Sequence, residues 1–97
     1  MLELEQPGDA AGARYRGAIY TPSLRADYHV GFDEAGVPTL VPSGEPPVRG
    51  DGTPTEETVN ARAVELLRSI ARTVGRHAVA ERPPAWPRRV LRWRKLD

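Results

Sequence analysis

The chain has 97 residues, of which 39% are apolar and 28% are charged, and it contains no cysteine. This length leaves room for one small hydrophobic core, and the lack of cysteine excludes disulfides and thiolate zinc sites. Two histidines are too few for a typical histidine-based metal site, so we expect no metal and no cofactor. Small domains often need stabilisation beyond their core, and association with another chain is the expected source here.

The net charge of +1 conceals two unlike halves. Residues 1–54 contain four basic and eight acidic residues, whereas residues 55–97 contain ten basic and five acidic residues. Such asymmetry is typical of a basic segment that binds an anionic partner. Thirteen of the fourteen basic residues are arginine. Because this bias runs through the whole chain, the choice of arginine over lysine carries little information about function.

The first twelve residues, 1–12, are expected to form a flexible leader. Pro7, Gly8 and Gly12 interrupt any periodic pattern there. The acidic start lacks the basic region and the apolar run of a signal peptide. No apolar stretch approaches the length needed to span a bilayer. The sequence therefore predicts a soluble, cytoplasmic protein.

Three segments that follow the leader predict an antiparallel sheet. Residues 14–21 alternate loosely in polarity, and residues 28–32 alternate strictly, which is the pattern of a half-buried strand. Residues 33–36 supply a hairpin connection. Residues 37–41 then return as a third strand, and Pro38 favours an edge position for it. We expect a three-stranded antiparallel meander within a single α+β domain over residues 13–81.

An amphipathic helix is predicted after the meander. Thr53, Pro54 and Glu56 fit a capping box in which Thr53 is the N-cap. Apolar residues then recur at helical spacing, namely Val59, Ala63, Leu66, Leu67, Ile70, Val74 and Ala78. This stripe predicts one helix packed across the sheet, which ends at Gly75 or at about Glu81.

The polar side of this helix carries Arg68, Arg72 and Arg76 as successive i, i+4 neighbours. Their like charges repel one another by a few tenths of a kcal/mol per pair. One interpretation is a solvated helix face on which salt screens the repulsion. The other is a possible anion-binding face for phosphate or for an acidic protein surface.

Residues 82–97 form a basic C-terminal arm that contains both tryptophans. The candidate partner-binding residues are Trp86, Arg88, Arg89, Arg92, Trp93, Arg94 and Lys95. Tryptophan and arginine are the residue types enriched at binding hot spots. Three interpretations stay open: the tryptophans complete their own core, they anchor the arm on a protein partner or sister subunit, or they stack on nucleic acid while arginine contacts phosphate. An anionic membrane surface is a weaker fourth interpretation.

No pattern in the sequence indicates catalysis. His29 and His77 have no neighbouring nucleophile or paired carboxylate, and no serine lies in a nucleophile elbow. We therefore expect no enzyme and no small-molecule substrate. The predicted function is a non-catalytic interaction or assembly protein that docks on a protein partner, or forms a homo-oligomer, through the arm. The alternative is a nucleic-acid-binding accessory protein that uses the arm together with the arginine face of the helix.

Overall fold

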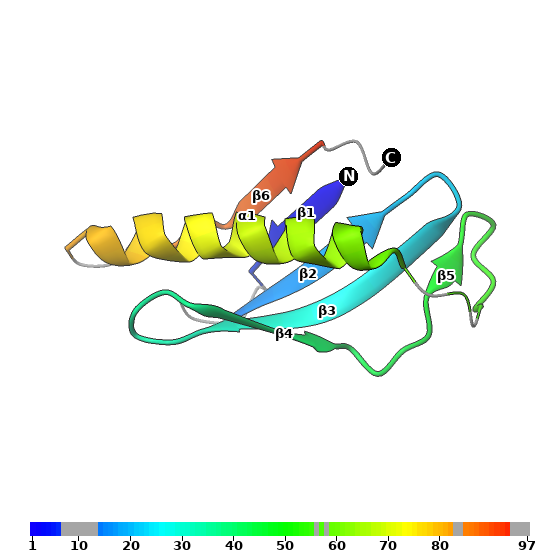
Figure 1. The fold of residues 1–97 in the computed structure, drawn as a ribbon, viewed down its shortest axis with the longest axis horizontal. Coiled ribbons are helices and arrows are strands. Elements are labelled where there is room, and N and C mark those ends of the chain that lie inside the picture. Colours follow the sequence, from blue (N-terminus) through cyan, green and yellow to red (C-terminus); the bar gives the residue numbers. More distant parts are fainter. Residues whose placement is uncertain (7–13, 56, 58, 83–84, 94–97) are drawn as a thin grey trace.

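The computed structural model describes residues 1–6, 14–55, 57, 59–82 and 85–93. Within these residues, one antiparallel sheet is crossed on one face by a single helix (Figure 1). The strands are β1 (Leu2–Glu5), β2 (Arg14–Tyr20), β3 (Leu24–Phe32), β4 (Pro38–Pro42), β5 (Val48–Arg49) and β6 (Arg89–Arg92), and the helix is α1 (Ala61–Ala80). The strand order is β4-β3-β2-β1-β6, with the short β5 also paired to β3.

The sheet contains the predicted meander but is larger than predicted. Strands β2, β3 and β4 pair consecutively, with Tyr15 opposite Val30 and Val30 opposite Leu40. The prediction of a three-stranded sheet was wrong, because β1 and β6 extend the sheet beyond β2. These strands have four residues each and pair across most of the chain, with Leu2 opposite Arg92. Neither strand has a local turn or a long alternating pattern that would reveal it.

Residues 2–5 of the expected flexible leader form β1, an inner strand of the sheet. Leu2 and Leu4 are buried against the helix, and the N-terminal ammonium group of Met1 donates a hydrogen bond of 2.7 Å to the Tyr20 carbonyl oxygen. Two buried leucines contribute about 1.5–3 kcal/mol each to folding, which explains why this short segment is part of the core. Residues 7–12 of the leader lie outside the described residues.

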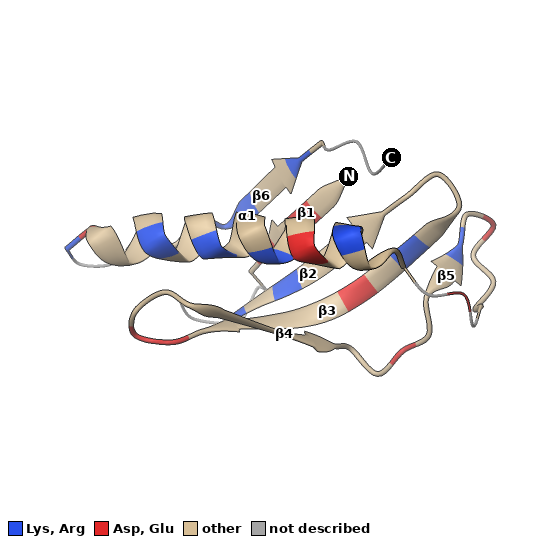
Figure 2. Cartoon of the chain, viewed as in Figure 1, with Lys and Arg blue, Asp and Glu red and all other residues tan. Residues whose placement is uncertain are grey.

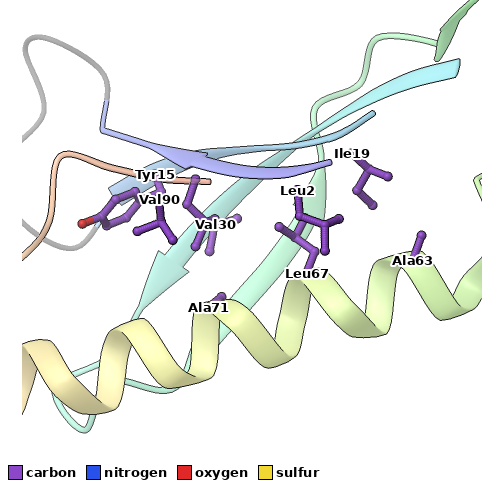
Figure 3. Packing of buried hydrophobic residues seen from close by; sticks show 9 residues of the cluster. Leu2, Tyr15, Ile19, Val30, Ala63, Leu67, Ala71 and Val90 are labelled. Atoms are coloured by element: carbon purple, nitrogen blue, oxygen red, sulfur yellow. The ribbon is translucent and has the colours of Figure 1, made fainter. Parts of the chain in front are cut away.

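The core lies between the sheet and one stripe of α1. Ala63, Leu67 and Ala71 of the helix face side chains from β1, β2, β3 and β6 (Figure 3). Gly75 lets the helix approach the β3–β4 connection closely, since a Cβ atom on Gly75 would lie 2.0 Å from the Gly36 carbonyl oxygen. The predicted amphipathic packing of the helix on the sheet is thus confirmed.

The helix begins later than predicted. Asn60 is the N-cap, and its side chain accepts a hydrogen bond of 2.7 Å from the Arg62 amide. The prediction of Thr53 as the cap was wrong, because Pro54 is bridged to Val48 and this segment therefore lies beside β5. Glu56, the third member of the predicted capping box, lies outside the described residues. At the other end the helix passes through Gly75 and is capped at Glu81, the later of the two predicted ends.

Candidate functional site

The middle of the C-terminal arm is a strand of the sheet. Residues 89–92 form β6, which pairs with β1 so that Val90 lies opposite Leu4. The Gln6 amide donates a hydrogen bond of 2.9 Å to the Arg88 carbonyl oxygen and extends the ladder by one residue. Two of the predicted partner-binding residues, Arg94 and Lys95, lie outside the described residues. The described part of the arm is therefore tied to the domain through backbone pairing.

Trp86 packs against the core. Its ring centroid lies 5.0 Å from that of Phe32 and 6.3 Å from that of Tyr15. The Tyr15 hydroxyl donates a hydrogen bond to the carbonyl oxygen of Pro87, which fixes the chain just after Trp86. Burial raises the pKa of Tyr15 to about 12. These contacts correspond to the interpretation in which a tryptophan completes the domain's own core.

Trp93 has a different environment. Its side chain is 76% exposed, and Leu91 is 37% exposed. Successive side chains of a strand point to opposite faces, and Val90 points into the core. Arg89 and Leu91 therefore point to the sheet face that α1 does not cover, and Trp93 follows directly after the strand. The two tryptophans of the arm thus lie in unlike surroundings.

On the same uncovered face, Arg89 takes part in an internal network. Glu3 is only 7% exposed, and its carboxylate accepts hydrogen bonds from Arg89 Nε at 2.9 Å and from the Tyr20 hydroxyl at 3.1 Å. Arg89 Nη2 lies 2.7 Å from the same carboxylate. The hydrogen bond to Glu3 raises the pKa of Arg89, while burial and the bond to Glu3 raise the pKa of Tyr20. Arg89 therefore neutralises a buried acid of its own domain.

A groove separates β6 from the C-terminal half of α1. It has a volume of about 530 Å³, and its apolar lining includes Val74, Ala78 and Val90. A smaller hollow of about 130 Å³ continues along the helix past Leu66 and Ile70, and Val74 and Arg92 border both spaces. We call the two together the α1–β6 groove. Its apolar wall on the helix side is made of partly buried side chains of α1 that also pack against the core.

The charged side chains that line the α1–β6 groove are Arg89, Arg92 and Glu81, and Arg89 is paired with Glu3. Arg92 lies opposite Leu2, so it projects toward the helix side and lines the groove. Its Nη1 atom donates a hydrogen bond of 2.8 Å to the Leu91 carbonyl oxygen. Among the described residues, neither Arg88 nor Arg92 forms an ion pair. Glu81 is the acidic side chain among those that line the larger space.

The predicted arginine face of the helix lies apart from this groove. Arg68, Arg72 and Arg76 occur along the solvent side of α1, where Figure 2 shows repeated basic bands. Arg68 pairs with Glu65. None of these three arginines lines the α1–β6 groove, whose helical wall is formed by the flank that contains Leu66 and Ile70. The structure therefore does not bring the two predicted basic surfaces together.

Sequence reasoning identified the residues of the arm but missed what surrounds them. The predicted apolar stripe of the helix included Leu66, Ile70 and Val74; all three pack against the core but remain partly exposed. The available signal was the breadth of the apolar stripe of α1, which exceeds what a three-stranded sheet can cover. The open edge of β6 could not be inferred from the sequence, because the strand itself was not predicted.

Three further findings concern metal sites, membrane spans and similarity to known proteins. No group of three or more His, Cys, Asp or Glu side chains within the described ranges is placed to hold a metal ion. In that same part of the chain, no helix has the length and apolar character required to cross a membrane. Comparison with known proteins found no matching family model, no matching curated protein and no matching solved structure.

Proposed function

We propose that this protein is a small non-catalytic interaction or assembly module that docks on a protein partner through residues 88–93. The observation that carries the proposal is the position of β6 at the edge of the sheet. Among the described residues β6 pairs only with β1, so its outer edge has no strand beside it. An unpaired strand edge is a ready template for pairing with another chain.

Exposed apolar side chains next to this edge support protein docking. Leu91 points to the uncovered sheet face, and the exposed Trp93 follows directly after β6. Isolated exposed leucines are ordinary in soluble proteins, but tryptophan is strongly enriched at binding hot spots. An open backbone edge beside a tryptophan offers both hydrogen-bonding groups and apolar area to a partner. This combination favours a protein surface over a small ligand.

Two residues of the arm, Trp86 and Arg89, are engaged within the domain and are therefore removed from the set of docking residues. Trp86 packs on Tyr15 and Phe32, so its contribution is to the stability of the domain. Arg89 is engaged by Glu3. The residues assigned to docking are therefore Arg88, Leu91, Arg92 and Trp93, together with Arg94 and Lys95 from the predicted set.

The alternative of a nucleic-acid-binding accessory protein receives less support. That function requires the arm and the arginine face of α1 to contact one phosphate chain. The two surfaces are separated by the flank of the helix that borders the α1–β6 groove. Arg68 is also paired with Glu65. Binding to nucleic acid is therefore one outcome that the test must distinguish.

The test is site-specific photocrosslinking in cells that express the protein naturally. A photoreactive phenylalanine analogue replaces Trp93 in one variant and Val37 in a control. Val37 is similarly suitable because it is 53% exposed and lies in the β3–β4 connection. We expect a protein adduct of defined mass from position 93 and none from position 37. Absence of a protein adduct at position 93, or an adduct with nucleic acid alone, would contradict the proposal.

A further inference from the structure

We infer that the edge of β6 accepts an extended, acidic segment of the partner, which adds to the sheet as an antiparallel strand and places an apolar side chain in the α1–β6 groove. This inference rests on the proposed function and specifies the chemistry of its partner. Strand addition is an established mode of peptide recognition, in which backbone hydrogen bonds give affinity and alternate side chains give specificity.

The hydrogen-bonding pattern of β6 identifies which backbone groups are open. Antiparallel pairs alternate between those that exchange hydrogen bonds and those that do not. The Gln6 amide bonds to the Arg88 carbonyl, so the pair of Leu4 with Val90 exchanges hydrogen bonds as well. The amide and carbonyl groups of Arg89 and Leu91 therefore point away from β1, toward the open edge. These are the groups that an added strand would engage.

Arg92 already occupies one of these groups. Its Nη1 atom donates to the outward carbonyl oxygen of Leu91 at 2.8 Å. An incoming backbone amide would take over this carbonyl and release the guanidinium group. A carboxylate on the same face of the added strand would then receive the released charge in a charge-assisted hydrogen bond. The arginine thus protects the edge in the free protein and attracts an acidic partner.

The groove selects the side chains of the added strand. Val90 and Arg92 lie on the helix-facing side of β6. Arg88 comes just before the strand, and its hydrogen bond with the Gln6 amide continues the ladder, so we expect its side chain to follow the same alternation. The side chain opposite Val90 would enter the groove beside Val74 and Ala78. The side chains two positions before and after it would lie opposite the two arginines. The expected partner segment therefore has an apolar residue at its centre and an acidic residue two positions before and two positions after it.

The positive charges of Arg88 and Arg92 disfavour pairing of the β6 edge with a second copy of this chain. Pairing of β6 with its own counterpart would bring Arg88 and Arg92 of both copies to one interface without adding an acidic residue from β6. Like charges on facing strands are destabilising. An acidic partner segment removes this repulsion and complements the electrostatic potential of the edge.

A peptide titration followed by amide NMR tests the inference on the full chain. The probe is the blocked peptide Thr-Glu-Thr-Val-Thr-Glu-Thr, and its charge-reversed control has lysine in place of glutamate. We expect the amide signals of Arg89, Leu91 and Val74 to shift in a saturable manner, with at least tenfold weaker binding of the lysine peptide. No shift at these positions, or equal binding of the two peptides, would overturn the inference.

Two matched pairs of variants separate strand addition from other binding. Leu91→Pro removes an outward amide without removing a hydrogen bond to β1, whereas Leu91→Ala keeps that amide. Arg92→Glu reverses a charge at the groove, whereas Arg72→Glu reverses one on the outer helix face. We expect Leu91→Pro to bind the peptide at least tenfold more weakly than Leu91→Ala, which lacks the same side chain. We expect Arg92→Glu to lose at least tenfold in peptide affinity and Arg72→Glu to stay within threefold of the unaltered protein. Each variant must first give a folded amide spectrum, and a folded Leu91→Pro protein with unchanged affinity would refute strand addition.

The peptide result and the crosslinking result can fail independently. If Trp93 yields a protein adduct but the acidic peptide does not bind, the protein docks through side chains of the uncovered sheet face and the strand-addition inference is wrong. If neither experiment gives a signal, the proposed function itself is wrong.

Discussion

The two tryptophans of one short basic segment contribute to different properties of the molecule. Trp86 contacts two aromatic rings of the core, whereas Trp93 is 76% exposed at the end of β6. Between them, Val90 contributes to the core and Leu91 does not. The alternation of a single strand therefore divides the arm into residues for folding and residues available for binding.

Substitution of each tryptophan by alanine should separate these two contributions. Trp86→Ala removes half-buried aromatic contacts, and we expect the free energy of unfolding to fall by roughly 2–4 kcal/mol. Trp93→Ala should change it by less than about 0.5 kcal/mol, as is usual for an exposed position. Urea unfolding monitored by circular dichroism measures both values. Equal destabilisation by the two substitutions would mean that Trp93 is also part of the core.

Tyr15 gives the molecule a specific response to alkaline pH. Its pKa is raised to about 12 by burial, compared with about 10 in the unfolded chain. The folded state therefore holds this proton more tightly, and the associated stability is complete below pH 10 and is lost as the pH rises to 12. Between pH 10 and 12 the Tyr15 hydroxyl is protonated in the folded chain but ionised in the unfolded chain. In this range the free energy of unfolding falls by up to about 1.4 kcal/mol per pH unit.

The variant Tyr15→Phe isolates this contribution from those of the other tyrosines. We expect it to lose about 1 kcal/mol at neutral pH, because the hydrogen bond to the Pro87 carbonyl oxygen disappears. Between pH 10 and 12, its stability should fall less steeply than that of the unaltered protein. Urea unfolding across this pH range provides the comparison, and identical slopes for the two proteins would contradict the assignment.

At the scale of elements, the helix and the meander were predictable because their patterns are long and local. The apolar stripe of α1 spans several turns, and the strands β2, β3 and β4 follow one another in the chain. The start of the helix was not predictable from the capping pattern alone. Pro54 forms a bridge with Val48 and Asn60 provides the actual cap, and both depend on where β5 lies.

Strands β1 and β6 illustrate what a sequence pattern cannot supply. Each offers only four residues, and each pairs with the other across nearly the whole length of the chain. The prolines and glycines beside β1 indicated a leader, and the residues around β6 indicated a basic arm that would either complete the core or bind a partner. Pairing between the two ends adds Leu2, Leu4 and Val90 to the core, and this burial decides their structure. The candidate binding residues were found from composition, but the groove and the open edge depend on tertiary structure.

At the scale of the whole molecule, one helix covers one face of the sheet, and its distance from the sheet differs between the β4 edge and the β6 edge. At the β4 edge, α1 approaches the β3–β4 connection so closely that Gly36 and Gly75 have no room for side chains. At the β6 edge, the helix and the sheet are separated by the α1–β6 groove. Within the described residues, β4 and β6 are both edge strands, and the α1–β6 groove lies beside β6. The proposed acidic segment would add at the β6 edge, where this groove can take one of its side chains.

Docking at the open edge of β6 can be measured in cells by combining the photoreactive residue at position 93 with a substitution at Leu91. Leu91→Ala keeps the outward amide and removes the same exposed side chain, so its yield of protein adduct is the reference. With Leu91→Pro, we expect the adduct to fall at least tenfold while the purified protein remains folded. An undiminished adduct from a folded Leu91→Pro protein would contradict docking through the strand edge.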